Sequence, residues 1–171
     1  MPRYVAFLRG VSPLNCKMPA LKGAFEAAGF TQVRTLLSSG NVAFDARSGS
    51  EAAIERRAEA AMRDALGRHF QAIVRSASHL HELLANDLLT PLGVPAEAKR
   101  VVTFARHDLV ARLPLPLATD GAAVMCAVGR EAYSAYLPGA EGPVFMKLIE
   151  KAFGNEVTTR TWATVARCAR A

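Results

Sequence analysis

Two short segments near the N-terminus carry groups suited to holding an anion. Arg9-Gly10 and Lys17 belong to the first, and Ser39-Gly40-Asn41 is the second. Cations, hydroxyls and turn amides gathered in one concavity suit a phosphate or carboxylate, because turn amides supply oriented partial positive charge. The alternative interpretation is a plain hairpin turn, in which Gly40-Asn41 tolerates a positive φ.

A third segment, Thr158-Thr-Arg-Thr-Trp162, lies where a strand is expected to end and the last helix to begin. Threonine hydroxyls can cap backbone amides there, and a helix N-terminus attracts anions. The guanidinium of Arg160, between Thr159 and Thr161, can hold an oxyanion through two hydrogen bonds. In the alternative interpretation, Thr161 is only an N-cap and Trp162 only packs in the core.

No motif for catalysis or metal binding stands out. The sequence has no G-x-S-x-G elbow and no phosphate-binding Walker loop. Cys16, next to Lys17 and ahead of a helix, is either a reactive thiol or a bystander. The histidines lack the spacing of a metal site: His69, His79, His81 and His107. We expect no metal and no cofactor.

Composition excludes several classes of protein. The chain has 171 residues, 51% of them hydrophobic, and this suits one domain or two small ones rather than a disordered chain. No apolar run approaches the roughly 20 residues of a membrane span, and the first ten residues lack a signal-peptide core. The three cysteines are widely spaced, which favours a reducing compartment. We expect a cytoplasmic protein without membrane contact.

The net charge of +6 is concentrated at the two ends of the chain. Residues 1–49 have six basic and two acidic side chains, and residues 157–171 have three arginines and no acid. If the ends meet, they form one electropositive face for an anionic ligand or a nucleic acid. The alternative is a compositional bias, since 16 of the 21 basic residues are arginine.

Apolar periodicity and turn residues predict the elements of the first half. Ser48 and Glu51 are expected to form a capping box at the start of a helix. Strands are predicted at residues 4–8, 33–37, 42–44 and 70–74, and helices at residues 18–28, 51–66 and 78–89.

Residues 90–98, rich in Pro and Gly, are the expected connection to a second half. The elements predicted there are a strand at residues 101–105, a short helical turn at 108–113, a hairpin of residues 122–128 and 132–137, a helix at 145–153, an extended segment at 157–159 and a helix at 161–170.

The predicted fold is α+β. It consists of two ferredoxin-like β-α-β-β-α-β pseudo-repeats, residues 1–90 and 99–171, each an antiparallel sheet with helices packed on one face. In that topology the first and third strands are neighbours. The loop of residues 9–17 is then beside the turn of residues 38–41, and Arg106 is beside Gly129-Arg130. RNA-recognition domains share this order, but Asn41-Val-Ala-Phe-Asp45 lacks their aromatic stacking platform.

Three motifs give the chain a family resemblance. Phe7-Leu-Arg-Gly10, Ser39-Gly-Asn-Val42 and the Thr158–Trp162 segment occur in that order. The chain resembles the bacterial family catalogued as domain of unknown function 1697, from about residue 3 to residue 165. The resemblance implies an α+β fold and no particular activity, substrate or cofactor. It directs attention to Arg9, Gly10, Ser39, Gly40, Asn41, Lys147, Thr159, Arg160 and Trp162.

The chain departs from the family pattern in places that matter for a ligand. Family members typically follow Arg-Gly with Ile/Val-Asn-Val-Gly-Gly-Lys, whereas this chain has Val11-Ser-Pro-Leu-Asn15. The missing glycine pair would best cradle a phosphate. Thr161 and Ala163 stand where the family tends to have Asn, and Met146 stands where it has Ser. The resemblance thus implies an altered polar pocket.

Three functions are compatible with the sequence. The first is a small anion-binding module that uses Arg9, Lys17, Asn41 and Arg160. The second is an enzyme with an unrecognised site, for example one that joins Cys16 or Ser39 to a base such as His107. The third is an interaction protein that pairs through its sheets.

Overall fold

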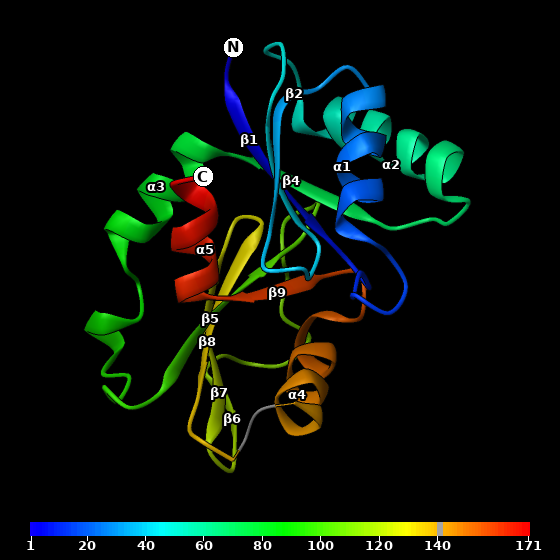
Figure 1. Cartoon of the computed structure of the whole chain (residues 1–171). Coiled ribbons are helices and arrows are strands. Elements are labelled where there is room, and N and C mark those ends of the chain that lie inside the picture. Colours follow the sequence, from blue (N-terminus) through cyan, green and yellow to red (C-terminus); the bar gives the residue numbers. More distant parts are fainter. Residues whose placement is uncertain (140–141) are drawn as a thin grey trace. The chain divides into compact units, whose positions relative to one another are not determined.

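The computed structural model describes residues 1–139 and 142–171, and these form two compact units. The first unit contains Met1–Leu83 together with Ala166–Ala171, and the second contains Leu84–Val165. The fold is α+β, with two antiparallel sheets and five α-helices within the described residues (Figure 1).

The first unit has a four-stranded sheet in the order β2-β3-β1-β4, in which all neighbours are antiparallel. Its elements are β1 (Arg3–Leu8), α1 (Met18–Ala27), β2 (Thr31–Leu36), β3 (Asn41–Asp45), α2 (Glu51–Leu66) and β4 (Ala72–Ser76), followed by the start of α3 (Ala77–Asn86). The sequence placed the last strand two residues too early.

The two ends of helix α2 are set by capping residues directly next to it in the sequence. Ser50, not Ser48, is the N-cap, and its hydroxyl accepts the Ala53 N–H at 3.1 Å. The predicted Ser48–Glu51 capping box is therefore wrong, because Glu51 instead accepts the N–H of Ser76 at 3.1 Å. Gly67 ends the helix in the left-handed conformation that glycine favours, with a φ of 66°.

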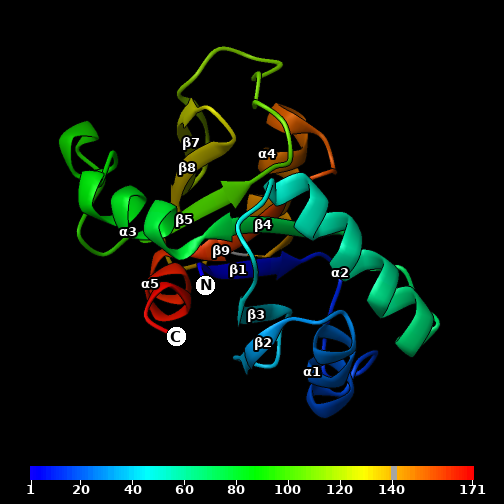
Figure 2. The ribbon, with the colours of Figure 1, turned by 90° about the horizontal axis from the view of Figure 1, so that it is seen from above.

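Helices α1 and α2 pack on one face of this sheet, as Figure 2 also shows. An aromatic cluster in this layer consists of Phe25 of α1, Phe44 of β3 and Phe30, which lies between α1 and β2. The ring centroids of Phe30 and Phe44 are 4.4 Å apart. Arg57 of α2 covers the Phe30 ring at 4.5 Å and donates to the carbonyl of Ala28 at the end of α1. The two helices are thereby held together on the sheet.

The second unit has a five-stranded sheet in the order β6-β7-β8-β5-β9. Its elements are a 3-10 turn η1 (Thr90–Leu92), β5 (Lys99–Phe104), β6 (Leu117–Thr119), β7 (Ala122–Val128), β8 (Glu131–Tyr136), α4 (Pro143–Phe153), β9 (Thr158–Thr161) and the first half of α5 (Trp162–Ala169). Helix α4 packs on one face of the sheet through Phe145, Leu148, Ile149 and Ala152.

The helical turn predicted at residues 108–113 is wrong, since these residues form no helix. Their backbone amides bond elsewhere: Leu109 N–H donates to Gly129 O, and Arg112 N–H to Ala152 O. Pro114 and Pro116 follow directly, and proline restricts the preceding residue away from helical conformation. The sequence also gave no signal for the three-residue strand β6.

Candidate functional site

The loop between β1 and α1 lies beside the β2–β3 turn, as the sequence predicted. Leu8 N–H donates to Gly40 O at 2.8 Å, and Phe7 pairs with Asn41 in the sheet register. Arg9 N–H donates to Gln71 O at 2.9 Å. Three connections of the first unit therefore meet at one end of its sheet. Likewise, in the second unit the predicted neighbours meet, because Ala105 N–H, next to Arg106, donates to Arg130 O.

The β2–β3 turn is tightly built. Leu37 and Ser38 both have a positive φ, 61° and 51°, which is uncommon outside glycine. Gly40 also has a positive φ, and a Cβ added there would stand 3.0 Å from Leu8 O and from Val11 Cβ. Only glycine fits at this contact between turn and loop. The turn thus fixes the position of the β1–α1 loop.

Asn41 supports this turn from within. Its side chain is 1% exposed, and its amide donates to Leu36 O and to the Ser39 hydroxyl, each at 3.2 Å. The Ser39 hydroxyl is therefore also engaged within the turn. The contacts of Asn41 and Ser39 therefore hold the β2–β3 turn in place, and the part of the β1–α1 loop that contains Arg9 lies next to this turn.

The β1–α1 loop has its own internal bonds. The Asn15 amide donates to Gly10 O at 2.7 Å, and its oxygen accepts the Ser12 N–H at 2.9 Å. Cys16 N–H donates to Ser12 O at 3.0 Å. In this chain Asn15 therefore orders the loop in which the family typically has a pair of glycines.

Three cations belong to this loop or contact it, and we call them the loop cations: Arg9, Lys17 and Arg68. All three are exposed, and Arg68 donates to Asn15 O at 3.4 Å. Within the described part of the first unit, none of them is paired with an acidic side chain. Sequence reasoning missed Arg68, because its place depends on how the α2–β4 connection returns to the sheet.

The N-terminus of α1 adds a further positive feature. Lys17 is the N-cap residue and makes no side-chain cap, and the first turn holds no acidic residue. The unsatisfied amides at a helix start carry partial positive charge. Burial raises the pKa of the neighbouring Cys16 thiol, and Arg68 has a smaller effect in the opposite direction.

The remaining predicted site residues lie in the second unit. Arg160 on β9 donates to the Thr158 hydroxyl at 2.6 Å and to Thr159 O at 2.8 Å. Thr161 caps α5 by accepting the Thr164 N–H at 3.3 Å, and the half-buried Trp162 opens that helix. Lys147 is exposed on α4. These contacts fit the capping interpretation of Thr161.

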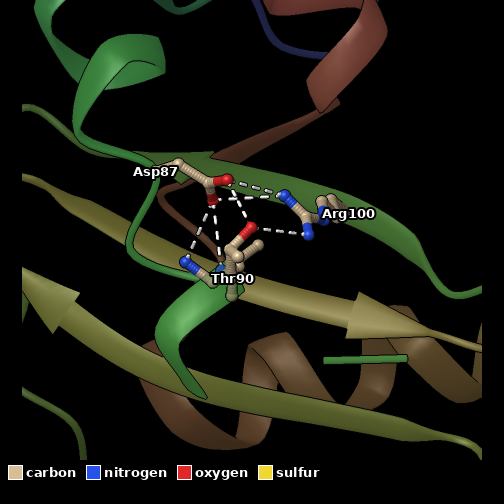
Figure 3. Close-up of polar contacts among 4 residues, drawn as sticks. Asp87, Thr90 and Arg100 are labelled. Carbon is tan, nitrogen blue, oxygen red and sulfur yellow. Dashed lines mark hydrogen bonds and ion pairs between the residues drawn. The ribbon is translucent and has the colours of Figure 1, made fainter. Parts of the chain in front are cut away.

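A compact polar cluster, not predicted from the sequence, joins the segment that follows α3 to β5 (Figure 3). Arg100 donates to both carboxylate oxygens of Asp87, at 3.0 and 3.2 Å, and to the Thr90 hydroxyl at 2.9 Å. Asp87 also accepts the Thr90 hydroxyl and the N–H groups of Leu89 and Thr90. The cluster fixes η1 to the second sheet, and all its charges are paired.

Other chemistries find little support in the described residues. No group of three or more His, Cys, Asp or Glu side chains there could hold a metal ion. All three cysteines are free. Among the helices of the described chain, none combines the length and apolarity needed to cross a membrane.

Comparison with known families decides the relationship. A family described as "Protein of unknown function (DUF1697)" matches residues 1–133. The chain belongs to this family. The match includes Phe7-Leu-Arg-Gly10 and Ser39-Gly-Asn-Val42 and ends before the Thr158–Trp162 segment.

Solved structures add a likeness of fold. A conserved bacterial protein of Streptococcus pneumoniae is similar, with a TM-score of 0.71 and 15% sequence identity over 99% of this chain and 97% of the other. No curated protein matches the chain. The DUF1697 membership and this likeness together support an α+β fold and name no ligand or reaction.

Proposed function

We propose that the first unit of this DUF1697 protein is a small anion-binding module for a phosphate-bearing ligand: a phosphorylated metabolite, a nucleotide or a nucleic-acid backbone. The observation that carries the proposal is the set of three loop cations, Arg9, Lys17 and Arg68, which have no acidic partner in the described first unit. Exposed cations without counter-charges around one ordered loop raise the local concentration of anions.

In this proposal each group has its own role. The guanidinium of Arg9 can bind two phosphate oxygens at once, and Lys17 and Arg68 add charge. The uncapped start of α1 offers backbone N–H groups to the same anion. Gly10, with a φ of 82° and no atom within 4 Å of an added Cβ, leaves the loop surface open. Ser39, Gly40 and Asn41 hold the neighbouring turn.

In the second unit, we propose Arg160 as a separate anion contact, together with Lys147, Thr159 and Trp162, the other positions of this unit that match the family pattern. Arg160 Nη1 donates to the Thr158 hydroxyl and to Thr159 O. These bonds orient its guanidinium on β9. An Arg160→Ala variant tests this contact independently of the loop cations.

We infer further that residues 1–90 and 99–171 are two ferredoxin-like pseudo-repeats. The neighbour order β7-β8-β5-β9 matches β2-β3-β1-β4 position by position, and both sets are antiparallel. The second copy differs by the irregular segment in place of a first helix and by the extra strand β6. The free state of all three cysteines supports our proposal of a cytoplasmic location.

Isothermal titration with pyrophosphate and with a short single-stranded oligonucleotide tests the anion site. Arg9→Ala and Arg68→Ala are each expected to weaken binding by about 1.5–3 kcal/mol, the scale of a hydrogen bond to a charged group. Oligonucleotide affinity is expected to fall with salt, with a log–log slope of about −0.7 per neutralised phosphate. Thermal melting should be nearly unchanged in both variants, because their side chains are exposed.

Arg47→Ala is the matched control. Arg47 is exposed and follows β3, at the opposite end of the sheet from the turn at Asn41. This variant should bind as the wild type does. Equal losses of binding affinity in Arg47→Ala and Arg9→Ala would show that the effect comes from net charge alone. An absence of binding at low salt would refute the anion-binding module.

A further inference from the structure

The second unit contains an apolar pocket of about 230 Å³, far from the loop cations in sequence and lined by that unit alone. Strands β7 and β8 form its floor, and the segment from Gly93 to Ala98, which follows η1, forms its roof. Among the described residues of its lining no side chain is charged, and the hydroxyls there belong to Thr119 and Tyr136.

Small side chains leave this space open. Ala123 on β7 and Ala135 on β8 are direct partners in the sheet register, and both line the floor. Ala98, Ala118 and Gly121 border it. The pocket is open to solvent, since Gly93, Pro95 and Thr119 of its lining are exposed. Larger apolar side chains on β7 and β8 would fill it, so the alanines leave it accessible to a small molecule.

A β-bulge places Met125 in the pocket. Val124 pairs with Ser134 and Cys126 with Tyr133, so Met125 is the extra residue on β7. Bulges re-aim a side chain and are enriched next to functional sites. Methionine is flexible and polarizable, and it adapts to ligands of different shape. The bulge is an observation independent of the pocket volume.

The Asp87–Thr90–Arg100 cluster holds η1, and with it the start of the Gly93–Ala98 segment, against the sheet. Arg100 pairs with Ala135 across β5 and β8, so both side chains are on the same face of the sheet. The cluster holds η1 there, and Gly93 follows with a left-handed φ of 74°. Ala98 N–H closes the segment by donating to Pro95 O at 3.1 Å. The pocket is thus preformed.

From these observations we propose that the pocket binds a small uncharged molecule with an apolar ring. An enclosed apolar cavity of about 150 Å³ holds benzene, so this open pocket of about 230 Å³ has room for a substituted or fused ring with one edge exposed to solvent. The described residues of the lining offer no counter-charge, which favours a ligand whose buried part is uncharged. The Thr119 hydroxyl can accept or donate one hydrogen bond at the rim.

Indole is a suitable probe, and the methyl signals of methionine report where it binds. In protein labelled with 13C at the methionine methyl groups, indole should shift the Met125 signal saturably. The Met62 signal should stay in place, because Met62 is fully buried in the first unit. Ala123→Phe, which fills the floor, should weaken indole binding at least tenfold, and Ala123→Leu should weaken it less.

Val128→Phe is the matched control, since Val128 is on the same strand, 58% exposed and outside the lining. It should leave the indole affinity unchanged. A non-saturable Met125 shift, or equal affinity in Ala123→Phe and the wild type, would overturn the proposal. If Ala123→Phe does not fold, Ala123→Leu decides. Pyrophosphate binding by the same samples reports on the first unit separately.

Discussion

At the scale of single residues, two hydroxyls in the second unit are buried without a partner. Thr103 on β5 and Ser134 on β8 are both 0% exposed, and neither oxygen makes a hydrogen bond with the described residues. Ser134 pairs with Val101, two residues from Thr103, so both hydroxyls are on the same sheet face. A buried polar group without a partner costs free energy.

Thr103→Val is therefore expected to raise the free energy of unfolding by roughly 1 kcal/mol, because it removes the hydroxyl and nearly conserves the volume. Thr103→Ala should lower it instead, since the lost methyl group leaves a small void. Urea unfolding of both variants measures the difference. A loss of stability in Thr103→Val would show that the hydroxyl has a partner, such as an enclosed water.

The Asp87 carboxylate is expected to make the stability of the fold depend on pH. Hydrogen bonding from the Thr90 hydroxyl is the main reason that its pKa is lowered, and Arg100 contributes less. A lowered pKa stabilises the fold above the ordinary aspartate pKa of 3.8, and this contribution is lost as the pH falls through the folded-state pKa. Thr90→Val should raise the Asp87 pKa in an NMR titration. An unchanged value would contradict this account of the cluster.

At the scale of elements, α2 protects the edge strand β4. Val74 N–H donates to Glu55 at 2.9 Å, Ala72 N–H to Glu59 at 3.4 Å and Ser76 N–H to Glu51 at 3.1 Å. Four residues advance about 6 Å along a helix, and two residues advance about 6.6 Å along a strand. Carboxylates four residues apart on α2 therefore align with every second backbone N–H of β4. They satisfy an edge that would otherwise be open to pairing.

Glu55→Ala should cost about 1.5–3 kcal/mol of unfolding free energy, because a buried N–H loses a charged acceptor. Glu55→Gln keeps an oxygen acceptor and should cost less. Hydrogen exchange at the Val74 amide should accelerate more in the alanine variant. Glu82→Ala, which removes an exposed glutamate from α3, is the control. Equal effects of Glu55→Ala and Glu82→Ala would contradict the edge-protecting role.

The elements differ in how well the sequence predicts them. Apolar spacing and the flanking Pro19 and Gly29 predicted α1 well, because a helix of this length carries its own boundary signals. The capping box predicted at the start of α2 failed because the Glu51 carboxylate accepts the N–H of Ser76 on β4 instead. Strand β6 is too short to show a pattern. A tertiary contact thus explains the failure at α2, and the short length of the strand explains the failure at β6.

At the scale of the whole chain, topology made part of the candidate site predictable. The antiparallel pairing of β1 with β3 brought the Arg9 loop to the Gly40 turn, and this followed from the order of elements alone. Arg68 and the pocket at Met125 were not foreseen. Their positions depend on a connection and on a β-bulge, neither of which has a local sequence signal. The DUF1697 match stops at residue 133, before the last three elements.

The first unit is discontinuous, because Ala166–Ala171 belong to it although they follow the whole second unit. Arg3 Nε donates to Ala171 O at 3.1 Å, while its Nη1 contacts Asp45 at 3.0 Å. Cys168 and Ala169 are buried. The last six residues thus support the beginning of β1, and their loss should lower the stability of a unit that is otherwise complete by residue 83.

A chain ending at Val165 is expected to lose roughly 1–3 kcal/mol of stability in the first unit, the scale of two small buried side chains and one charged hydrogen bond. Hydrogen exchange at the β1 amides should accelerate, since β1 begins at Arg3. Arg170→Ala, at an exposed position of the same segment, should leave exchange unchanged. Faster exchange confined to β9, with β1 unaffected, would assign these residues to the second unit.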